Sequence, residues 1–183
     1  MNRPGFTEMK VHRLVLDPST NSPIVVLQDE SSGSLLPIWI GIFEAHSIAM
    51  KLEGAEPQRP MTHDLLRSFF DVTKSLVERV EVVDLVDNTY FARIYFSIND
   101  RAFALDSRPS DAIALALRTV SPIFVANHVL EKSKIDPAPE QTEAGESGQK
   151  GESETHASPD PETEWDEILK KFNPPGGKPP KIN

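Results

Sequence analysis

Apolar and polar residues alternate or cluster along the first 135 positions in patterns that predict a sheet. β-branched and aliphatic runs are bounded by turn-forming Pro, Ser, Asn and Gly, as is typical of strands. Residues 92–98 alternate strictly, and Asp-Asn and Asn-Asp turns on either side of them predict a three-strand meander. The predicted strands are residues 10–16, 24–27, 35–40, 80–85, 92–98, 102–106 and 122–126.

Three helices are predicted between these strands. Ala45, Ile48, Ala49 and Leu52 recur at helical spacing ahead of Gly54. Thr62 is predicted to cap a second helix, whose core face comprises Leu65, Leu66, Phe69, Val72 and Leu76. The third, residues 110–118, is apolar nearly all round and is therefore predicted to be buried.

Strands and helices do not alternate strictly, and this favours an α+β fold. We expect a mixed, largely antiparallel sheet with three main helices and a disordered acidic C-terminal tail. The chain of 183 residues is accordingly divided into an N-terminal extension (1–8), a folded domain (9–135), a disordered acidic linker (136–164) and a C-terminal segment (165–183).

The two C-terminal parts are predicted from composition. Residues 136–164 are dense in Pro, Glu, Ser, Thr and Gly and carry most of the formal net charge of −9, so they cannot bury enough apolar surface to fold. In the last segment, Trp165, Ile168, Leu169 and Phe172 have roughly helical spacing before a Pro/Gly/Lys-rich end. This segment is either a short docking element for a protein partner or the apolar end of a disordered tail.

Several classes of protein are excluded by absent features. The chain has no cysteine, which excludes disulfides, thiolate metal sites and a cysteine nucleophile. No apolar run is long enough for a membrane span, and the N-terminus lacks a signal-peptide pattern. We therefore expect a cytoplasmic protein without membrane association. P-loop, dinucleotide-binding, HExxH and nucleophile-elbow motifs are also absent.

Candidate chemistry lies in the stretches PIWIGIFEAHSIAMKLEG (37–54), RPMTHDLL (59–66) and LDSRPSDAIALALR (105–118). Asp106 ends a predicted strand and Asp111 falls in the first turn of a helix. These carboxylates, with Glu44 as a further ligand, suit Mg²⁺ or Mn²⁺.

The remaining candidates complete a set for metal-assisted phosphodiester hydrolysis. Arg59 and Arg108 can bind phosphate, and His63 can carry a proton near neutral pH. Asp64, beside His63, can activate water or bind the metal. The alternative is structural: Asp64 and Asp111 suit the helix dipole, and the two arginines pair with these acids and fix loops.

The three stretches, in this order and followed by SPIFV, resemble the bifunctional nuclease (BFN) domain family over residues 9–135. The resemblance implies an α+β domain, dimers or higher oligomers, and the nuclease activity on RNA and DNA attributed to plant members. It carries the family's motif positions onto Glu44, Arg59, Pro60, Thr62, His63, Asp64, Asp106, Arg108, Pro109, Ser110 and Asp111.

Two functions follow from these observations. The first is a nuclease acting on RNA, DNA or both, assisted by a divalent metal. The second is a non-enzymatic regulatory or protein-binding module, in which the Arg-Pro and Asp motifs are structural and the C-terminal segment recruits a partner through Trp165 and Phe172.

Overall fold

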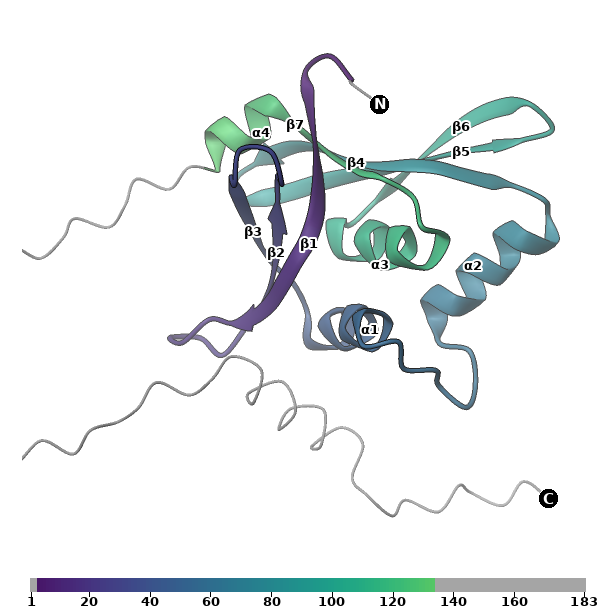
Figure 1. The fold of residues 1–183 in the computed structure, drawn as a ribbon, viewed down its shortest axis with the longest axis horizontal. Helices are drawn as coiled ribbons and strands as arrows, with labels where there is room; N and C mark the ends of the chain where they lie inside the picture. Colours follow the sequence, from purple (N-terminus) through teal and green to yellow (C-terminus); the bar gives the residue numbers. More distant parts are fainter. Residues whose placement is uncertain (1–2, 134–183) are drawn as a thin grey trace, which may run out of the picture. The chain divides into compact units, whose positions relative to one another are not determined.

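The computed structural model describes residues 3–133 of the chain. A mixed seven-stranded sheet organises this domain (Figure 1). The strand order is β3-β2-β1-β7-β4-β5-β6, and neighbouring strands are antiparallel except for the parallel pair β4 and β7. The strands are β1 (Phe6–Leu16), β2 (Pro23–Gln28), β3 (Leu35–Trp39), β4 (Leu76–Val86), β5 (Thr89–Ile98), β6 (Arg101–Ser107) and β7 (Ile123–Ala126).

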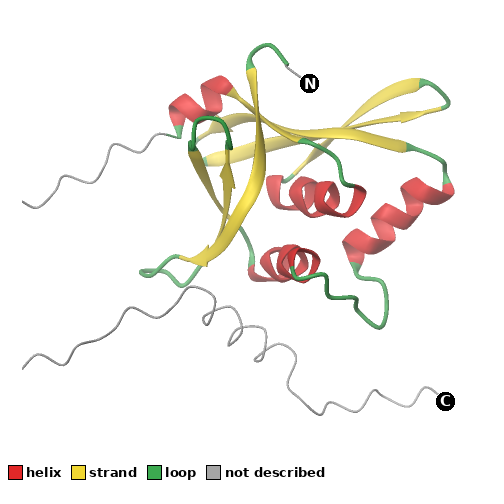
Figure 2. Cartoon of the chain, viewed as in Figure 1, coloured by secondary structure: helices red, strands yellow, loops and turns green. Residues whose placement is uncertain are grey.

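Three eleven-residue helices and one short helix accompany the sheet (Figure 2). The predicted α+β class is thereby confirmed, as is the largely antiparallel sheet with three main helices. The predicted acidic linker and docking segment, residues 136–183, lie outside the described residues. The helices are α1 (Ile42–Leu52), α2 (Thr62–Val72), α3 (Pro109–Thr119) and α4 (Asn127–Lys132).

Strand β1 connects the two halves of the sheet. Its first part, residues 6–9, pairs with β7, and its second part, residues 10–16, pairs with β2, with an irregularity in register between Val11 and Arg13. Residues 6–8, predicted as part of an extension, are thus integral to the sheet.

The β4–β5–β6 meander has the two tight turns that the sequence predicts. Asp87 and Asn88 have φ angles of 47° and 59°, and Asn99 and Asp100 have 48° and 61°. Two consecutive residues with positive φ are the mark of a type I′ turn, whose twist matches that of the flanking strands. Asn and Asp tolerate this conformation better than other non-glycine residues.

Helix α3 is the centre of the core. It packs on β4 and β5, and α1 and α2 pack against it in turn (Figure 1). Ala112, Ile113, Ala114, Leu115 and Ala116 are all buried. A helix enclosed on several sides must be apolar nearly all round, so the prediction of a buried third helix is confirmed.

The predicted cap of α2 is wrong. Met61 is the N-cap residue, and Thr62 is the first residue of the helix. The Asp64 carboxylate accepts a hydrogen bond from the Met61 backbone N–H at 3.0 Å. The Asp64 carboxylate, and not a Thr62 hydroxyl, therefore accepts a backbone hydrogen bond at the start of α2.

The predicted core face of α2 is also largely wrong. Phe69 and Val72 are 59% and 83% exposed, and Leu65 and Leu76 are exposed as well, whereas Phe70 is buried. The physical reason is the position of α3: α2 packs mainly against α3 and reaches the sheet mainly through Phe70, which contacts Phe96 of β5. Most of its apolar side chains therefore face outward.

Val120, which ends α3, has an unfavourable backbone conformation. Its φ and ψ are 56° and 39°, in the left-handed region, and the residue is 90% exposed. A β-branched residue is strained there, and glycine is the usual choice at this position. We expect Val120→Gly to raise the free energy of unfolding by up to about 1 kcal/mol, measured by urea denaturation. A lower urea midpoint would show that the Val120 side chain makes a stabilising contact.

Candidate active site

The polar side chains of α1, α2 and α3 converge where these helices meet. We call this group the polar cluster, and it spans the start of each helix and the last turn of α3. Its members are Glu44, Ser47, His63, Asp64, Arg108, Asp111 and Arg118.

Arg108, the N-cap residue of α3, forms the exposed end of the polar cluster. Its Nε and Nη2 donate to the two carboxylate oxygens of Asp111 at 2.7 and 3.1 Å, and Nη2 also lies 2.8 Å from Glu44 Oε1. The Arg108 side chain is nevertheless 65% exposed, so the guanidinium is accessible to a ligand. A Cβ at Gly41 would overlap the Glu44 carboxylate, so a side chain at this position would displace Glu44 from its present place.

His63 lies behind Asp111. Its Nε2 is 3.0 Å from Asp111 Oδ1, and its Nδ1 is 2.9 Å from Ser47 Oγ. A carboxylate only accepts hydrogen bonds, so Nε2 carries the proton and the Nδ1 of a neutral ring accepts from the Ser47 hydroxyl. Ser47 is only 2% exposed. This Ser-His-Asp arrangement therefore orients the imidazole and does not present a serine nucleophile.

The environment of Asp111 keeps it ionised. Burial alone would raise the pKa of Asp111, but hydrogen bonds from Arg108 and His63 and their positive charge bring it below the usual value. At neutral pH the polar cluster therefore contains a carboxylate held between a guanidinium and an imidazole.

Arg118 and Asp64 form the buried end of the polar cluster. Arg118 Nε donates to Asp64 Oδ1 at 2.6 Å, while its Nη1 and Nη2 donate to the carbonyls of Ala114 and Ser47. Burial would raise the pKa of Asp64, but the Arg118 and Met61 hydrogen bonds lower it overall. Asp64 Oδ1 thus holds α2 to α3, and Oδ2 accepts the backbone N–H of Met61 at the start of α2.

Asp106, predicted to act with Asp111, lies on the other face of the sheet. Phe103 stacks on Phe96, and Phe96 in turn contacts Phe70 of α2, so Phe103 faces the helices. Side chains alternate along a strand, and Asp106 therefore points away from them, on the side of Arg93, its register partner in β5. The structure does not bring Asp106 to Asp111.

Arg59 is likewise separate from the polar cluster. It lies exposed on the loop between α1 and α2 and makes no ion pair within residues 3–133. Of the two predicted phosphate-binding arginines, only Arg108 is held beside the acidic residues.

The predicted metal ligands do not form a three-ligand set in this arrangement. Glu44 and Asp111 both contact the Arg108 guanidinium, which lies between them, and Asp106 is elsewhere. In the described part of the chain, no three His, Asp or Glu side chains are grouped closely enough to hold a metal ion. The need for Mg²⁺ or Mn²⁺ remains a prediction.

Ser47 and Arg118 were not predicted as site residues, although the sequence carries a signal for each. Ser47 is a hydroxyl within the apolar stripe of α1, and Arg118 is a cation in an otherwise apolar helix. A buried charge requires a partner of opposite sign, and Asp64 fulfils that requirement.

The fold and the polar cluster define an α+β domain in which an arginine, acidic residues and a histidine meet at helix N-termini. Sequence comparison assigns this domain to a family. The model of the Bifunctional nuclease domain matches residues 25–138, a segment that contains the whole polar cluster. The chain belongs to the bifunctional nuclease domain family.

Individual relatives differ in how much of their length aligns with this chain. An uncharacterized protein of Mycobacterium tuberculosis is 37% identical over 128 residues, which are 70% of this chain and 76% of the relative. Bifunctional nuclease 2 of Arabidopsis thaliana is 30% identical over 112 residues, 60% of this chain and 34% of the relative. Bifunctional nuclease 1 of the same plant is 29% identical over 135 residues, 67% of this chain and 42% of the relative. The plant proteins are thus matched over less than half of their length.

We expect Asp64→Asn to lower the free energy of unfolding by about 3 kcal/mol, because it leaves the buried Arg118 guanidinium without its counter-charge. Urea denaturation measures this loss. The double variant Asp64→Leu/Arg118→Met is the matched control and should recover much of the stability, because it removes both charges together. Equal stability of Asp64→Asn and the native chain would contradict a structural role for the pair.

The same pair predicts an acid dependence of stability. The pKa of Asp64 is lower in the folded state than its unfolded value of about 3.9. The ionised Asp64 carboxylate therefore contributes fully to the free energy of unfolding above about pH 4. This contribution is lost as the pH falls through the folded-state pKa. We expect thermal stability to decline below about pH 4 and to decline less steeply in Asp64→Asn. Identical slopes for both proteins would assign the acid sensitivity to other carboxylates.

Proposed function

We propose that this domain hydrolyses phosphodiester bonds of RNA, DNA or both at the exposed end of the polar cluster. The observation that carries this proposal is the Asp111 carboxylate, held between the exposed Arg108 guanidinium and the His63 imidazole. A guanidinium at a helix N-terminus suits a phosphate group. The names of the plant relatives support the same activity.

Each residue has a distinct role in this proposal. Arg108 binds non-bridging phosphate oxygens and offsets their charge as the pentavalent transition state forms. A water oxygen attacks phosphorus, its proton passes to Asp111, and the P–O bond to the leaving group breaks, with solvent protonating the leaving oxygen. His63 donates a hydrogen bond from its Nε2–H to Asp111 and keeps the carboxylate oriented.

Assistance by Mg²⁺ or Mn²⁺ is a further part of the proposal. Glu44 and Asp111 are the predicted ligands that lie in the polar cluster, and Arg108 contacts both of them. A bound divalent ion would supply additional positive charge for the phosphate. The roles of Arg108, Asp111 and His63 do not depend on it.

The test is cleavage of labelled single-stranded RNA and DNA by the purified full-length chain, with Mg²⁺, Mn²⁺ or EDTA. We expect Asp111→Asn and Arg108→Gln each to lower the cleavage rate by about 100-fold or more. Asp87→Asn and Arg13→Gln are matched controls: Asp87 is in the β4–β5 turn and Arg13 is exposed on β1. These control variants should cleave at the native rate.

Three outcomes would overturn parts of the proposal. Equal cleavage by Asp111→Asn and the native chain would indicate a contaminating nuclease. Loss of activity in Asp106→Asn, with Asp111→Asn still active, would move the site to the other face of the sheet. Full activity in EDTA would show that cleavage needs no divalent metal, and the proposed roles of the protein residues would stand.

A second candidate function is a non-enzymatic regulatory or binding module. The observation that favours it is mutual pairing: Glu44 and Asp111 pair with Arg108, and Asp64 pairs with Arg118. Such pairs can simply hold helices together. Absence of cleavage under every ionic condition, with the expected loss of stability in Asp64→Asn, would select this function.

The remaining expectations stay proposals as well. They are a cytoplasmic location, a protein partner for residues 165–183, and assembly into dimers or higher oligomers. Within residues 3–133, no helix has the length and apolar character needed to cross a membrane.

A further inference from the structure

An exposed aromatic ring lies at the start of α1, next to the proposed active site. Phe43 is the second residue of this helix and directly precedes Glu44. Its side chain is 71% exposed, more than that of any other phenylalanine or tryptophan in residues 3–133. A single exposed apolar residue needs no explanation by itself. What distinguishes Phe43 is its position beside the polar cluster.

Helix geometry places Phe43 on the side of α1 that carries the polar cluster. Residues four positions apart share a side of a helix, and Ser47, four residues after Phe43, hydrogen-bonds His63. The next residue after Phe43, Glu44, contacts Arg108 at 2.8 Å. Side chains of a helix lean towards its N-terminus, which in α1 is the end where Glu44 meets Arg108. The Phe43 ring therefore borders the exposed end of the polar cluster.

Phe43 and Arg108 lie on opposite sides of His63. Successive helical residues turn by about 100° around the axis, so Ser47 lies between Phe43 and Glu44, about 40° from the first and about 60° from the second. His63 contacts Ser47, and Arg108 contacts Glu44. A helix with its side chains is only about 10–12 Å across. A nucleotide next to a phosphate bound at Arg108 can therefore reach the Phe43 ring.

The charges at the exposed end of the polar cluster favour a stacking contact as the main source of affinity. Arg108 is paired there with two carboxylates, those of Glu44 and Asp111. Binding of a nucleic acid through its phosphates alone needs several cations, and this end of the cluster offers one. A base stacked on an aromatic ring adds affinity without any charge. The exposed Phe43 ring is suited to that role.

A stacking contact of this kind selects unpaired nucleotides. In a duplex each base is covered by the neighbouring base pairs, so only an unpaired base can lie flat on an aromatic side chain. A phenylalanine ring also has no hydrogen-bonding group with which to read the edge of a base. We therefore expect a preference for unpaired segments and little discrimination among the four bases.

We propose that a base next to the scissile phosphate stacks on Phe43, and that the domain therefore acts on unpaired segments of RNA or DNA. This inference rests on the proposed nuclease activity, which supplies the position of the phosphate at Arg108. Phe43 contributes to substrate binding and touches no reacting atom, so it determines specificity and is not a catalytic residue.

Binding of a fluorescent single strand tests the stacking contact without any cleavage. The probe is a short DNA that contains 2-aminopurine and has cleavage-resistant phosphorothioate linkages. Stacking on an aromatic ring quenches this base, so the full-length chain should lower its emission. Phe43→Leu should bind about ten-fold more weakly and without quenching, and Phe43→Trp should restore both. The matched control is Phe91→Leu, at an exposed phenylalanine of β5, which should bind like the native chain.

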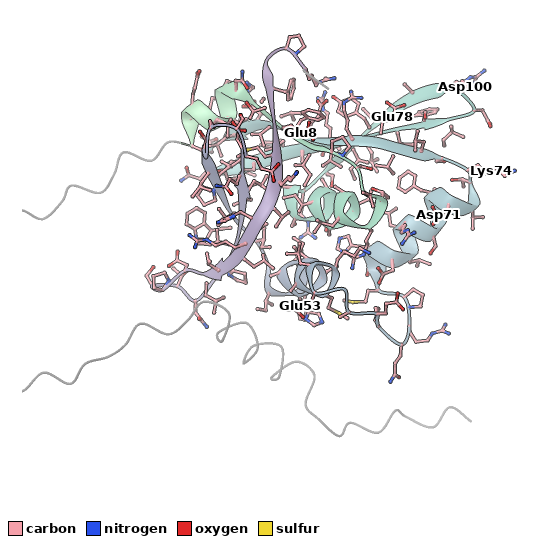
Figure 3. The ribbon with its side chains drawn as sticks, viewed as in Figure 1. Glu8, Glu53, Asp71, Lys74, Glu78 and Asp100 are labelled. Atoms are coloured by element: carbon pink, nitrogen blue, oxygen red, sulfur yellow. The ribbon has the colours of Figure 1, made fainter. Side chains whose placement is uncertain are left out.

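The salt dependence of binding tests how few phosphates are contacted. Each phosphate contact with a single strand changes the slope of log affinity against log salt concentration by about −0.7, so one or two contacts predict a slope of about −1. Arg108→Gln should flatten this slope. Lys74→Gln should not, because Lys74 follows the end of α2 opposite to His63 (Figure 3). A slope steeper than about −4 would indicate a broad basic surface and overturn stacking as the main contact.

Cleavage kinetics give a second, independent measurement. Phe43→Leu should raise KM about ten-fold and leave kcat within about two-fold, because the contact is the same in the bound substrate and in the transition state. A blunt, fully paired duplex should not compete with a single-stranded substrate, whereas a duplex with an unpaired overhang should compete.

The outcomes separate this inference from the proposed activity. Quenching that depends on Phe43, without cleavage by the native chain, would support the stacking contact and overturn the nuclease. Cleavage with an unchanged KM in Phe43→Leu, and no quenching by the native chain, would overturn the stacking contact and leave the nuclease in place. Equal binding of the blunt duplex and the single strand would overturn the preference for unpaired segments.

Discussion

The burial of the Arg118 guanidinium is the constraint on which the helical half of the domain depends. The side chain is 3% exposed, and a buried cation without acceptors would cost several kcal/mol. Its acceptors come from all three main helices: Asp64 on α2, the Ser47 carbonyl on α1 and the Ala114 carbonyl on α3. The position of His63 follows, because it is next to Asp64 and hydrogen-bonds the Ser47 hydroxyl.

Much of the fold could be predicted because its signals are local. Each of these signals is encoded within a few neighbouring residues. They are the alternation in residues 92–98, the Asp-Asn and Asn-Asp turns on either side of it, and the apolar residues all round α3. The outward face of α2 could not be predicted in this way. An amphipathic pattern identifies an apolar side of a helix, but the structure shows Phe69 and Val72 on the side that neither α3 nor the sheet covers.

The candidate site was predictable to the same extent. Arg108 and Asp111 are three residues apart at a helix start, so their contact is nearly local. The contact of His63 with Asp111 joins residues 48 positions apart, and no local pattern in the sequence predicts it. Asp106 was misplaced because a strand turns neighbouring side chains to opposite faces. Arg118 was missed because its burial depends on how three helices pack.

The position of β1 also determines the order in which the domain can fold. Strand β1 is the first strand in the sequence and pairs with β7, the last one. Thr7 also hydrogen-bonds Asn127, which lies 120 positions further along the chain. The β4–β6 meander needs only short turns, whereas this closure brings distant segments together and forms slowly. During synthesis the first part of β1 therefore has no strand partner on that side until β7 has been made. Completion of the sheet is a late event of biosynthesis.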